Sequence, residues 1–218
     1  SRKMIKLASY IDHTLLKPFC TEAEIEQLCQ EAKENGFAAV CVPPCYVSLA
    51  ARILNDSGVN ICTVVGFPLG YNDTNVKLYE TETLIHAGAT EIDVVVNVTW
   101  IKSGQWDKVD KELEQLSALI SSHNAVFKLI FETAYLTSDE IMQLADLCLK
   151  NKVHYLKTST GFAPKGAELE VVKAIKARIG DQAKIKASGG ISDRDTAIAF
   201  IEAGADRIGT SSGVKIVS

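Results

Sequence analysis

The sequence predicts an α/β protein, a (β/α)8 TIM barrel in which eight parallel strands are surrounded by outer helices. Short runs rich in Val and Ile alternate with segments of helical periodicity along the chain, and this alternation is typical of parallel strands joined by crossover helices. The runs are apolar on both faces, as expected for a sheet that is covered on both sides. Eight such steps in 218 residues suit a compact barrel, since about 250 residues is typical.

A doubly wound open sheet is the structural alternative. That fold carries a glycine-rich fingerprint after its first strand, where the backbone approaches a dinucleotide. The corresponding segment here, "IDHTLLKP", contains no glycine. No linker or low-complexity segment interrupts the pattern, so residues 1–218 are expected to form a single TIM-barrel domain.

The strands are predicted from apolar runs of four to seven residues, apart from a shorter first run. A faint repeat supports the assignment, because "HAGATEIDV" and "EAGADRIGT" both end a helix at Ala-Gly-Ala and begin a strand. The predicted strands lie at residues 10–12, 37–42, 60–65, 91–96, 126–131, 154–158, 183–187 and 206–209.

The clearest helix signals are two capping boxes. Thr21 with Glu24, and Thr137 with Glu140, are spaced as the first and last residues of this motif, and Gly36 follows the first helix as its stop. The other helices are expected at residues 44–56, 73–87, 105–121, 166–179, 192–203 with Ser192 as the cap, and 211–217.

Composition restricts the kinds of partner and the compartment. With 47% hydrophobic and 23% charged residues the chain resembles ordinary soluble proteins. Its net charge of −4 argues against nucleic acid or an anionic membrane as a partner. We find no apolar run of membrane-spanning length and no signal peptide. Six cysteines without a C-x-x-C pair indicate reduced thiols in a cytoplasmic protein.

Three lysines lie in or at the end of consecutive predicted strands. Lys157 follows Lys128 by 29 residues, and Lys186 follows Lys157 by the same interval, about one βα step. If their side chains point into the barrel, the three ammonium groups share a small volume near its C-terminal mouth, since neighbouring strands lie about 4.8 Å apart. Alternation along the fourth strand places Asp93 on the same face as Glu91, so this strand can carry a carboxylate inward.

Clustered lysines suit imine chemistry. A lysine must be neutral to attack a carbonyl, and the usual pKa of about 10.4 leaves few neutral molecules at pH 7. Desolvation and a neighbouring cation both lower such a pKa. The alternative is structural, because inward lysines are often paired with carboxylates. Glu132 could neutralise one lysine and Asp93 another, which leaves a surplus of cations.

Glycine-rich loops near the end of the chain suggest an anion site. "SGGIS" follows the seventh strand, "GTSSG" follows the eighth, and "TSTG" adds hydroxyl groups after the sixth. In barrels, the loops after strands seven and eight often bind phosphate through backbone N–H groups. Simple turn chemistry is the competing explanation.

No metal site is expected. His13 lies near the end of the first strand, but no cysteine or histidine partner has the spacing of metal ligands, and His86, His123 and His154 are scattered along the sequence.

Eight segments together resemble one known family, the deoxyribose-phosphate aldolases. In order they are "YIDHTLLKP", "VCVPP", "VVGFPLG", "EIDVVVN", "KLIFET", "LKTSTGF", "IKASGGI" and "GTSSG". The resemblance extends from Tyr10 to Gly213. It implies a class I, metal-independent lyase that needs no cofactor. Such an enzyme reversibly cleaves 2-deoxy-D-ribose 5-phosphate to D-glyceraldehyde 3-phosphate and acetaldehyde, in deoxyribonucleotide catabolism.

The resemblance also implies roles for individual residues. Lys157 matches the Schiff-base lysine, Lys186 the second lysine that assists proton transfer, and Asp93 the acid/base aspartate. The remaining matches are Lys128, Asp12, Thr14, Cys41 and Thr160 around the pocket, and Gly161, Gly189, Gly190, Gly209, Ser211 and Ser212 for phosphate.

Two positions depart from the family pattern. Phe162 stands where many members have lysine, and Ser192 where many have arginine. The backbone loops would then be the main anchor for phosphate, helped by Lys165 or Arg194. We therefore expect phosphate binding to depend weakly on side-chain charge.

Two other functions stay open at this stage. One is a sugar-phosphate isomerase or epimerase on the same barrel, which would use a carboxylate without an imine. The other is a non-catalytic phosphate-binding barrel. The expected partners are a small sugar phosphate and short aldehydes, and relatives that are often dimers suggest a homodimer.

Overall fold

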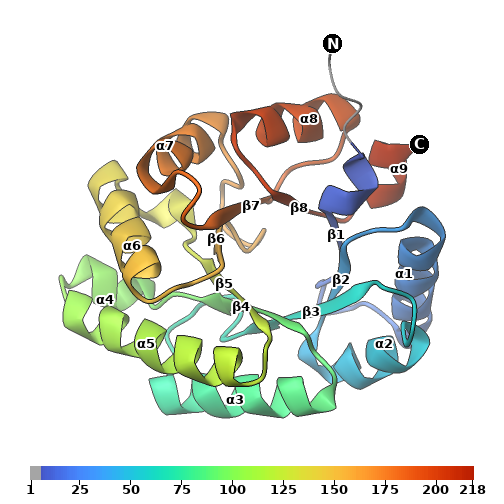
Figure 1. The fold of residues 1–218 in the computed structure, drawn as a ribbon, viewed down its shortest axis with the longest axis horizontal. Coiled ribbons are helices and arrows are strands. Elements are labelled where there is room, and N and C mark those ends of the chain that lie inside the picture. The colour runs from blue at the N-terminus through green and yellow to red at the C-terminus, as the bar shows by residue number, and fades with distance from the viewer. Residues whose placement is uncertain (1–5) are drawn as a thin grey trace.

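A computed structural model describes residues 6–218, and these form a closed barrel of eight parallel strands in chain order (Figure 1). The predicted fold class is confirmed. Each strand pairs with its neighbours in sequence, and β8 closes the barrel against β1. The prediction about a signal peptide concerns a terminus that includes residues 1–5, which lie outside the described range.

The strands match the predicted apolar runs, with boundaries that differ by at most two residues. The first strand begins and ends later than expected, because the segment before it forms a short 3₁₀ helix, η1 (Leu7–Tyr10). The strands are β1 (Ile11–Thr14), β2 (Ala39–Val42), β3 (Asn60–Val65), β4 (Glu91–Val95), β5 (Val126–Ile130), β6 (Tyr155–Lys157), β7 (Lys184–Ser188) and β8 (Arg207–Thr210).

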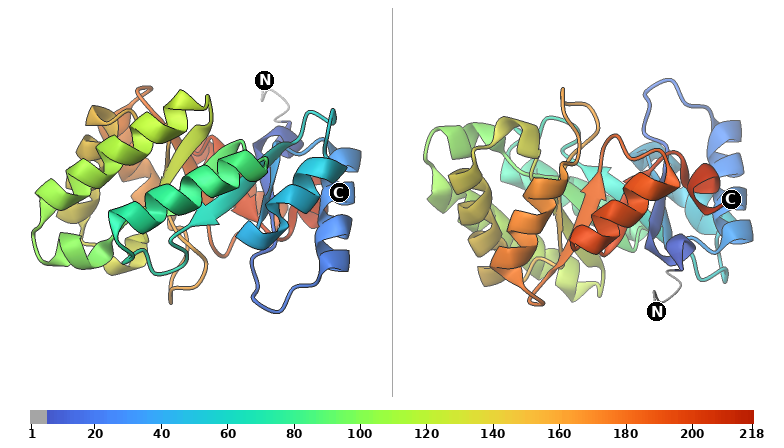
Figure 2. Two further views of the ribbon diagram at one scale, coloured as in Figure 1. Left: turned by 90° about the horizontal axis from the view of Figure 1, so that it is seen from below. Right: turned by 90° about the horizontal axis from the view of Figure 1, so that it is seen from above.

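Helices surround the strands, as the side views show (Figure 2). A short helix after β4 was not predicted, and the segment after β2 divides into a 3₁₀ turn and a helix. The helices are α1 (Glu22–Asn35), η2 (Pro44–Tyr46), α2 (Val47–Ile53), α3 (Thr74–Ala87), α4 (Val98–Lys102), α5 (Trp106–Ser122), η3 (Thr133–Tyr135), α6 (Ser138–Lys150), α7 (Leu169–Ile179), α8 (Arg194–Ala203) and α9 (Gly213–Val217).

Capping explains where several helices begin and end. Both predicted capping boxes are formed, at the starts of α1 and α6, and Gly36 ends α1 in the left-handed conformation. The prediction of Ser192 as the cap of α8 is wrong. The side chain of Asp193 accepts a hydrogen bond from the Thr196 N–H instead, so the helix begins one residue later.

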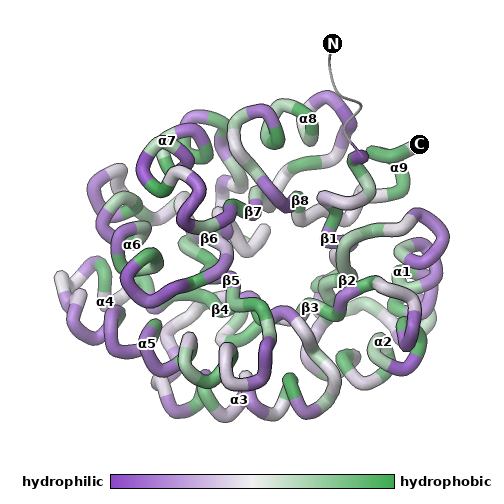
Figure 3. The backbone as a smooth tube through the Cα atoms, viewed as in Figure 1, coloured by the Kyte–Doolittle hydropathy of each residue, from purple (hydrophilic) through white to green (hydrophobic). Residues whose placement is uncertain are grey.

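The hydrophobic core lies between the strands and the helices. Strand residues that point outward, such as Ile92, Leu129 and Leu156, pack against apolar helix faces, and the outer helices alternate between hydrophobic and hydrophilic stretches (Figure 3). The barrel interior is different, because many inward side chains are charged. Among residues 6–218, no helix is both long and apolar enough to span a membrane.

Candidate active site

A cavity of about 420 Å³ opens at the C-terminal end of the barrel, between the loops that follow β1, β6, β7 and β8. A cavity of this size is in the range that holds small ligands. It brings together nine of the residues singled out in the sequence, and these are Thr14, Lys157, Thr160, Gly161, Gly189, Gly190, Gly209, Ser211 and Ser212.

Lys157 lies on the floor of this cavity. It is the last residue of β6, and its side chain is only 4% exposed. Its Nζ donates a hydrogen bond to Oδ2 of Asp93 at 3.0 Å. Lys186 is its register partner on β7 and contacts the same Asp93 oxygen at 2.8 Å. The two lysines therefore point to the same side of the sheet and meet at one carboxylate.

Lys128 lies deeper in the barrel. It pairs in register with Asp93 on one side and with Tyr155 on the other, so it sits two residues below the level of Lys157. The equal spacing in sequence therefore does not place all three lysines at one level. Strands in a closed barrel are staggered, and equal βα lengths do not fix the stagger. Lys128 still reaches Asp93, with its Nζ 3.0 Å from Oδ1.

Beneath the cavity floor, buried carboxylates and cations form one network. Asp93 lies at its centre and contacts three lysines. Four cations face three carboxylates, so one formal positive charge is in excess, as the sequence suggested. The members are Asp12, Glu91, Asp93, Lys128, Lys157, Lys186 and Arg207.

The partners in this network differ from the predicted ones. Glu132 does not pair with a lysine, because its carboxylate accepts hydrogen bonds from the backbone N–H and hydroxyl of Thr160. Arg207 was missed, and it contacts Asp12 at 2.6 Å and Glu91 at 2.9 Å. Its place on the same strand as Gly209, two residues earlier, was the available signal, since residues two apart share a face.

Burial and charge act against each other on these groups. Burial alone would raise the pKa of Asp93, but Lys128, Lys157 and Lys186 hold this pKa well below its ordinary range. Burial alone would lower the pKa of Lys186, but Asp12 and Asp93 raise it well above its ordinary value. Lys186 is therefore a cation at neutral pH, and Asp93 is an anion.

Two cysteines complete the inward surface. Cys41 and Cys62 are register partners on β2 and β3. The Cys62 thiol donates to Oδ1 of Asp93 at 3.1 Å, and burial raises its pKa well above the ordinary value. The neighbouring Cys62 thiol lowers the pKa of Cys41, and burial opposes this effect. Both are reduced thiols.

Several potential metal ligands lie close together inside the barrel. Cys62 lies near Cys41 and Asp93 on one side, and near Asp12 and Glu91 on the other, within ligand-to-ligand distances of 4.8 Å. Each of these carboxylates is already in contact with Lys or Arg. A divalent ion would have to displace or face those cations, so the donor set does not suit a metal.

Glycine at position 209 leaves room for Lys186. A Cβ atom on Gly209 would lie 2.9 Å from Cε of Lys186, closer than carbon atoms approach. The glycine loop after β8 therefore positions a lysine as well as lining the cavity. After β7, Gly189 and Gly190 both have positive φ values, of 90° and 81°, which favour glycine and turn the loop across the cavity.

The cation that lies near the glycine loops is not one of the two that the sequence suggested. Lys165 and Arg194 do not line the cavity, whereas Lys17, from the loop after β1, does. The Lys17 ammonium lies 5.7 Å from the centre of the exposed Phe19 ring. Phe162 lies at the rim, and its ring packs edge-on against Phe67 at 5.4 Å. Ser192 also lines the cavity.

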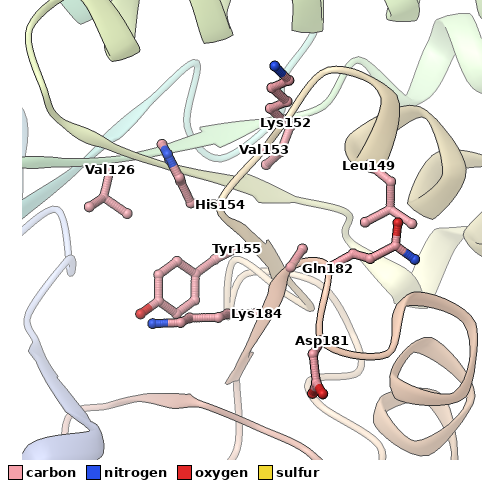
Figure 4. A pocket seen from close by; sticks show the side chains of 10 residues that line it. Val126, Leu149, Lys152, Val153, His154, Tyr155, Asp181, Gln182 and Lys184 are labelled. Carbon is pink, nitrogen blue, oxygen red and sulfur yellow. The ribbon is translucent and has the colours of Figure 1, made fainter.

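A second cavity, of about 480 Å³, lies at the opposite end of the barrel (Figure 4). It opens where β5, β6 and β7 begin. The Lys184 side chain runs beside the ring of Tyr155, with its Nζ 5.6 Å from the ring centre. In barrel enzymes, the active site lies at the C-terminal end of the strands. None of the predicted site residues lines this second cavity.

His13 packs away from both cavities. It alternates with the inward Asp12 along β1, so its ring lies outside the barrel against Phe37. Its Nε2 is 2.9 Å from a carboxylate oxygen of Glu31, and burial lowers its pKa. It takes no part in the network around Asp93.

Comparisons with known proteins agree with this geometry. The model of the DeoC/LacD family aldolases matches residues 6–218. The deoxyribose-phosphate aldolase of Thermoanaerobacter sp. is 48% identical, covering 98% of this chain and 96% of that protein. The one from Mannheimia succiniciproducens is 49% identical, covering 97% and 94%.

A solved structure is also closely similar. The deoxyribose phosphate aldolase of Aeropyrum pernix, described as a unique tetrameric structure, superposes with a TM-score of 0.90 at 36% identity, covering 97% of this chain and 89% of that one. The family match over nearly the full chain confirms the resemblance drawn from the eight motifs. This chain belongs to the DeoC/LacD aldolase family.

Proposed function

We propose that this protein is a class I aldolase that reversibly cleaves 2-deoxy-D-ribose 5-phosphate to D-glyceraldehyde 3-phosphate and acetaldehyde. One observation carries the proposal. Of the three lysines clustered around Asp93, Lys157 alone lines the cavity, and its nitrogen shares a carboxylate oxygen with the cationic Lys186. The proposed substrate is the one for which the relatives described above are named.

Lys157 is the proposed nucleophile because a substrate in the cavity can reach it. Lys186 is fully buried and remains protonated, since its pKa is raised by Asp12 and Asp93. Attack on an aldehyde requires a neutral amine, and of these two lysines only Lys157 faces the cavity. The two lysines thus take different roles although both contact Asp93.

The proposed reaction proceeds through an imine. Neutral Lys157 adds to the C1 aldehyde of the open-chain sugar, and loss of water gives an iminium. A base removes the C3 hydroxyl proton, the C2–C3 bond breaks, and its electron pair flows into the iminium to give an enamine. Glyceraldehyde 3-phosphate leaves. The enamine is protonated at C2, and water hydrolyses the resulting iminium to release acetaldehyde and regenerate Lys157.

Asp93 and Lys186 are proposed to move the protons. Asp93 accepts from the substrate through a water or hydroxyl group, and Lys186 returns a proton by way of the shared oxygen of Asp93. Lys128, Asp12 and Arg207 hold Asp93 and Lys186 in place from below. No metal or cofactor is required, since the iminium is itself the electron sink.

The phosphate group is proposed to bind at the glycine-rich side of the cavity. The backbone of Gly189, Gly190 and Gly209 and the hydroxyl groups of Ser211 and Ser212 would provide donors there. Lys17 is the cation that lines this cavity besides Lys157, so we assign it the contribution that lysine or arginine makes at positions 162 and 192 in many relatives.

Reductive trapping tests the proposal. Sodium borohydride with acetaldehyde should add a two-carbon mass to Lys157, located by peptide mass spectrometry, and should abolish retro-aldol activity. Lys157→Leu should lose both the label and the activity, by at least about a thousandfold, while the control Lys165→Leu keeps both. EDTA should not change the rate.

The outcomes separate the candidate reactions. A label on Lys186 would overturn the assignment of the nucleophile. Turnover of a sugar phosphate without inactivation by borohydride would indicate an isomerase or epimerase. Tight binding of the sugar phosphate without turnover would indicate a non-catalytic barrel.

We also propose that residues 1–218 act as one domain in the cytoplasm, and that the protein assembles as a homodimer. Association of this fold has a precedent in the relative from Aeropyrum pernix, which is described as tetrameric. Multi-angle light scattering measures the assembly directly, and a mass of one or four chains would contradict the dimer.

A further inference from the structure

Two histidines and a glutamate that are distant in sequence meet on the outside of the barrel. Glu82 and His86 lie on α3, and His123 caps the C-terminus of α5. One carboxylate oxygen and one nitrogen from each ring all lie within 4.8 Å of one another. The three side chains are exposed, and α3 and α5 are neighbours in the outer layer (Figure 1).

The fold holds these three positions together. Glu82 and His86 are four residues apart, so they share a face of α3. The helices α3 and α5 are joined by a buried ion pair in which Lys77 donates to Glu112 at 2.9 Å, and Thr74 donates to the same carboxylate. The rings of His86 and His123 meet edge-on, with centres 5.5 Å apart.

The donor atoms are available to a ligand. Within residues 6–218, none of the three side chains makes a hydrogen bond or ion pair with another group of the protein. Two imidazole nitrogens and one carboxylate oxygen are the donors typical of a late first-row divalent metal, above all Zn²⁺, whereas Mg²⁺ and Ca²⁺ prefer oxygen.

We propose that Glu82, His86 and His123 form a Zn²⁺ site that links α3 to α5. Metal–ligand distances around Zn²⁺ are about 2.0–2.2 Å, and the three donor atoms already lie within 4.8 Å of one another. Because the three side chains are exposed, they can rotate to reach this geometry without movement of the helices. A water completes the coordination.

The role of this site is structural. The C-terminal ends of α3 and α5 lead into β4 and β5 at the start of those strands, so the site lies at the opposite end of the barrel from Lys157. A metal bound there ties two helices in the folded state and does not reach the substrate. It therefore stabilises the fold by an amount that rises with the logarithm of the metal concentration above the dissociation constant, and it leaves catalysis unchanged.

The test uses the untagged full chain after treatment with EDTA. Addition of Zn²⁺ at a concentration well above its dissociation constant should raise the thermal midpoint by about 2–5 °C, whereas Mg²⁺ should not. Isothermal titration should give one Zn²⁺ per chain, and Co²⁺ should produce visible absorption bands from nitrogen and oxygen ligands.

Matched variants locate the site. His86→Ala, His123→Ala and Glu82→Gln should each reduce the shift, and the double histidine variant should abolish it. Glu114→Gln, an exposed control on α5, and Cys45→Ser, which removes the exposed thiol, should keep the full shift. Retro-aldol activity should be the same with and without Zn²⁺ in every variant.

Two results would overturn the proposal. One is a wild-type protein that shows no change in midpoint and no binding heat with Zn²⁺. The other is an unchanged shift in the double histidine variant, which would place the metal elsewhere. Neither result would contradict the proposed imine at Lys157, because borohydride trapping tests the imine in a separate experiment.

Discussion

Lys157 and Lys186 are register partners on β6 and β7, and the nitrogens of both contact Oδ2 of Asp93, at 3.0 and 2.8 Å. The buried Lys186 ammonium therefore lies beside the Lys157 amine, which faces the cavity. Asp93 is the carboxylate that contacts both lysines, whereas Asp12 contacts only Lys186 of the two. Substitution of Asp93 is therefore the most direct test of what the network contributes to stability and activity.

Asp93→Asn should lower both stability and activity. Removing one partner from a buried network leaves the remaining charges uncompensated, which typically costs about 3–5 kcal/mol. The free energy of unfolding in urea should fall by that amount, and kcat should fall by at least about a hundredfold. Asp110→Asn, which breaks an exposed pair with Lys150, is the control and should cost about 0–1 kcal/mol.

The pH dependence of stability should reveal the same carboxylates. The pKa values of Asp12 and Asp93 are lowered in the folded protein, whereas in the unfolded chain they are about 3.9. As the pH falls below about 5, the unfolded chain takes up protons that the folded protein does not, so the stability falls. Urea midpoints between pH 6 and 3 should show a shallower fall in Asp93→Asn than in the wild type, and equal slopes would contradict the assignment.

The buried pair of Lys77 and Glu112 should be a stabilising link that catalysis does not need. Lys77→Met leaves a buried carboxylate without its cation and should cost about 3–5 kcal/mol. Lys77→Met combined with Glu112→Leu removes both charges and should recover much of that loss. A double-mutant cycle from urea unfolding measures the coupling, and KM for the sugar phosphate should be unchanged in all three variants.

Lys17 should contribute to phosphate binding. Lys17→Gln should raise KM for deoxyribose 5-phosphate by about tenfold, the loss of one charge-assisted contact, and leave KM for unphosphorylated deoxyribose nearly the same. Lys165→Ala and Arg194→Ala are the controls, because neither residue lines the cavity. A large rise in KM for either control, or none for Lys17→Gln, would show that the phosphate binds elsewhere.

Local patterns in the sequence were sufficient for much of the fold. Strand order, helix order and both capping boxes follow from periodicity and from residues three or four apart, and these interactions form within one element. The pairing of Lys157 with Lys186 was also predictable, since consecutive strands of a parallel barrel are neighbours. The motifs that surround these lysines were enough to indicate the family.

The tertiary structure decided everything that depends on register and on contacts between distant segments. Barrel stagger set Lys128 one layer below the other lysines, and closure of β8 against β1 brought Arg207 to Asp12. Packing of α3 against α5 brought His86 to His123, which in sequence look unrelated. These contacts join residues tens of positions apart, and no local period specifies how far one strand or helix slides along the next.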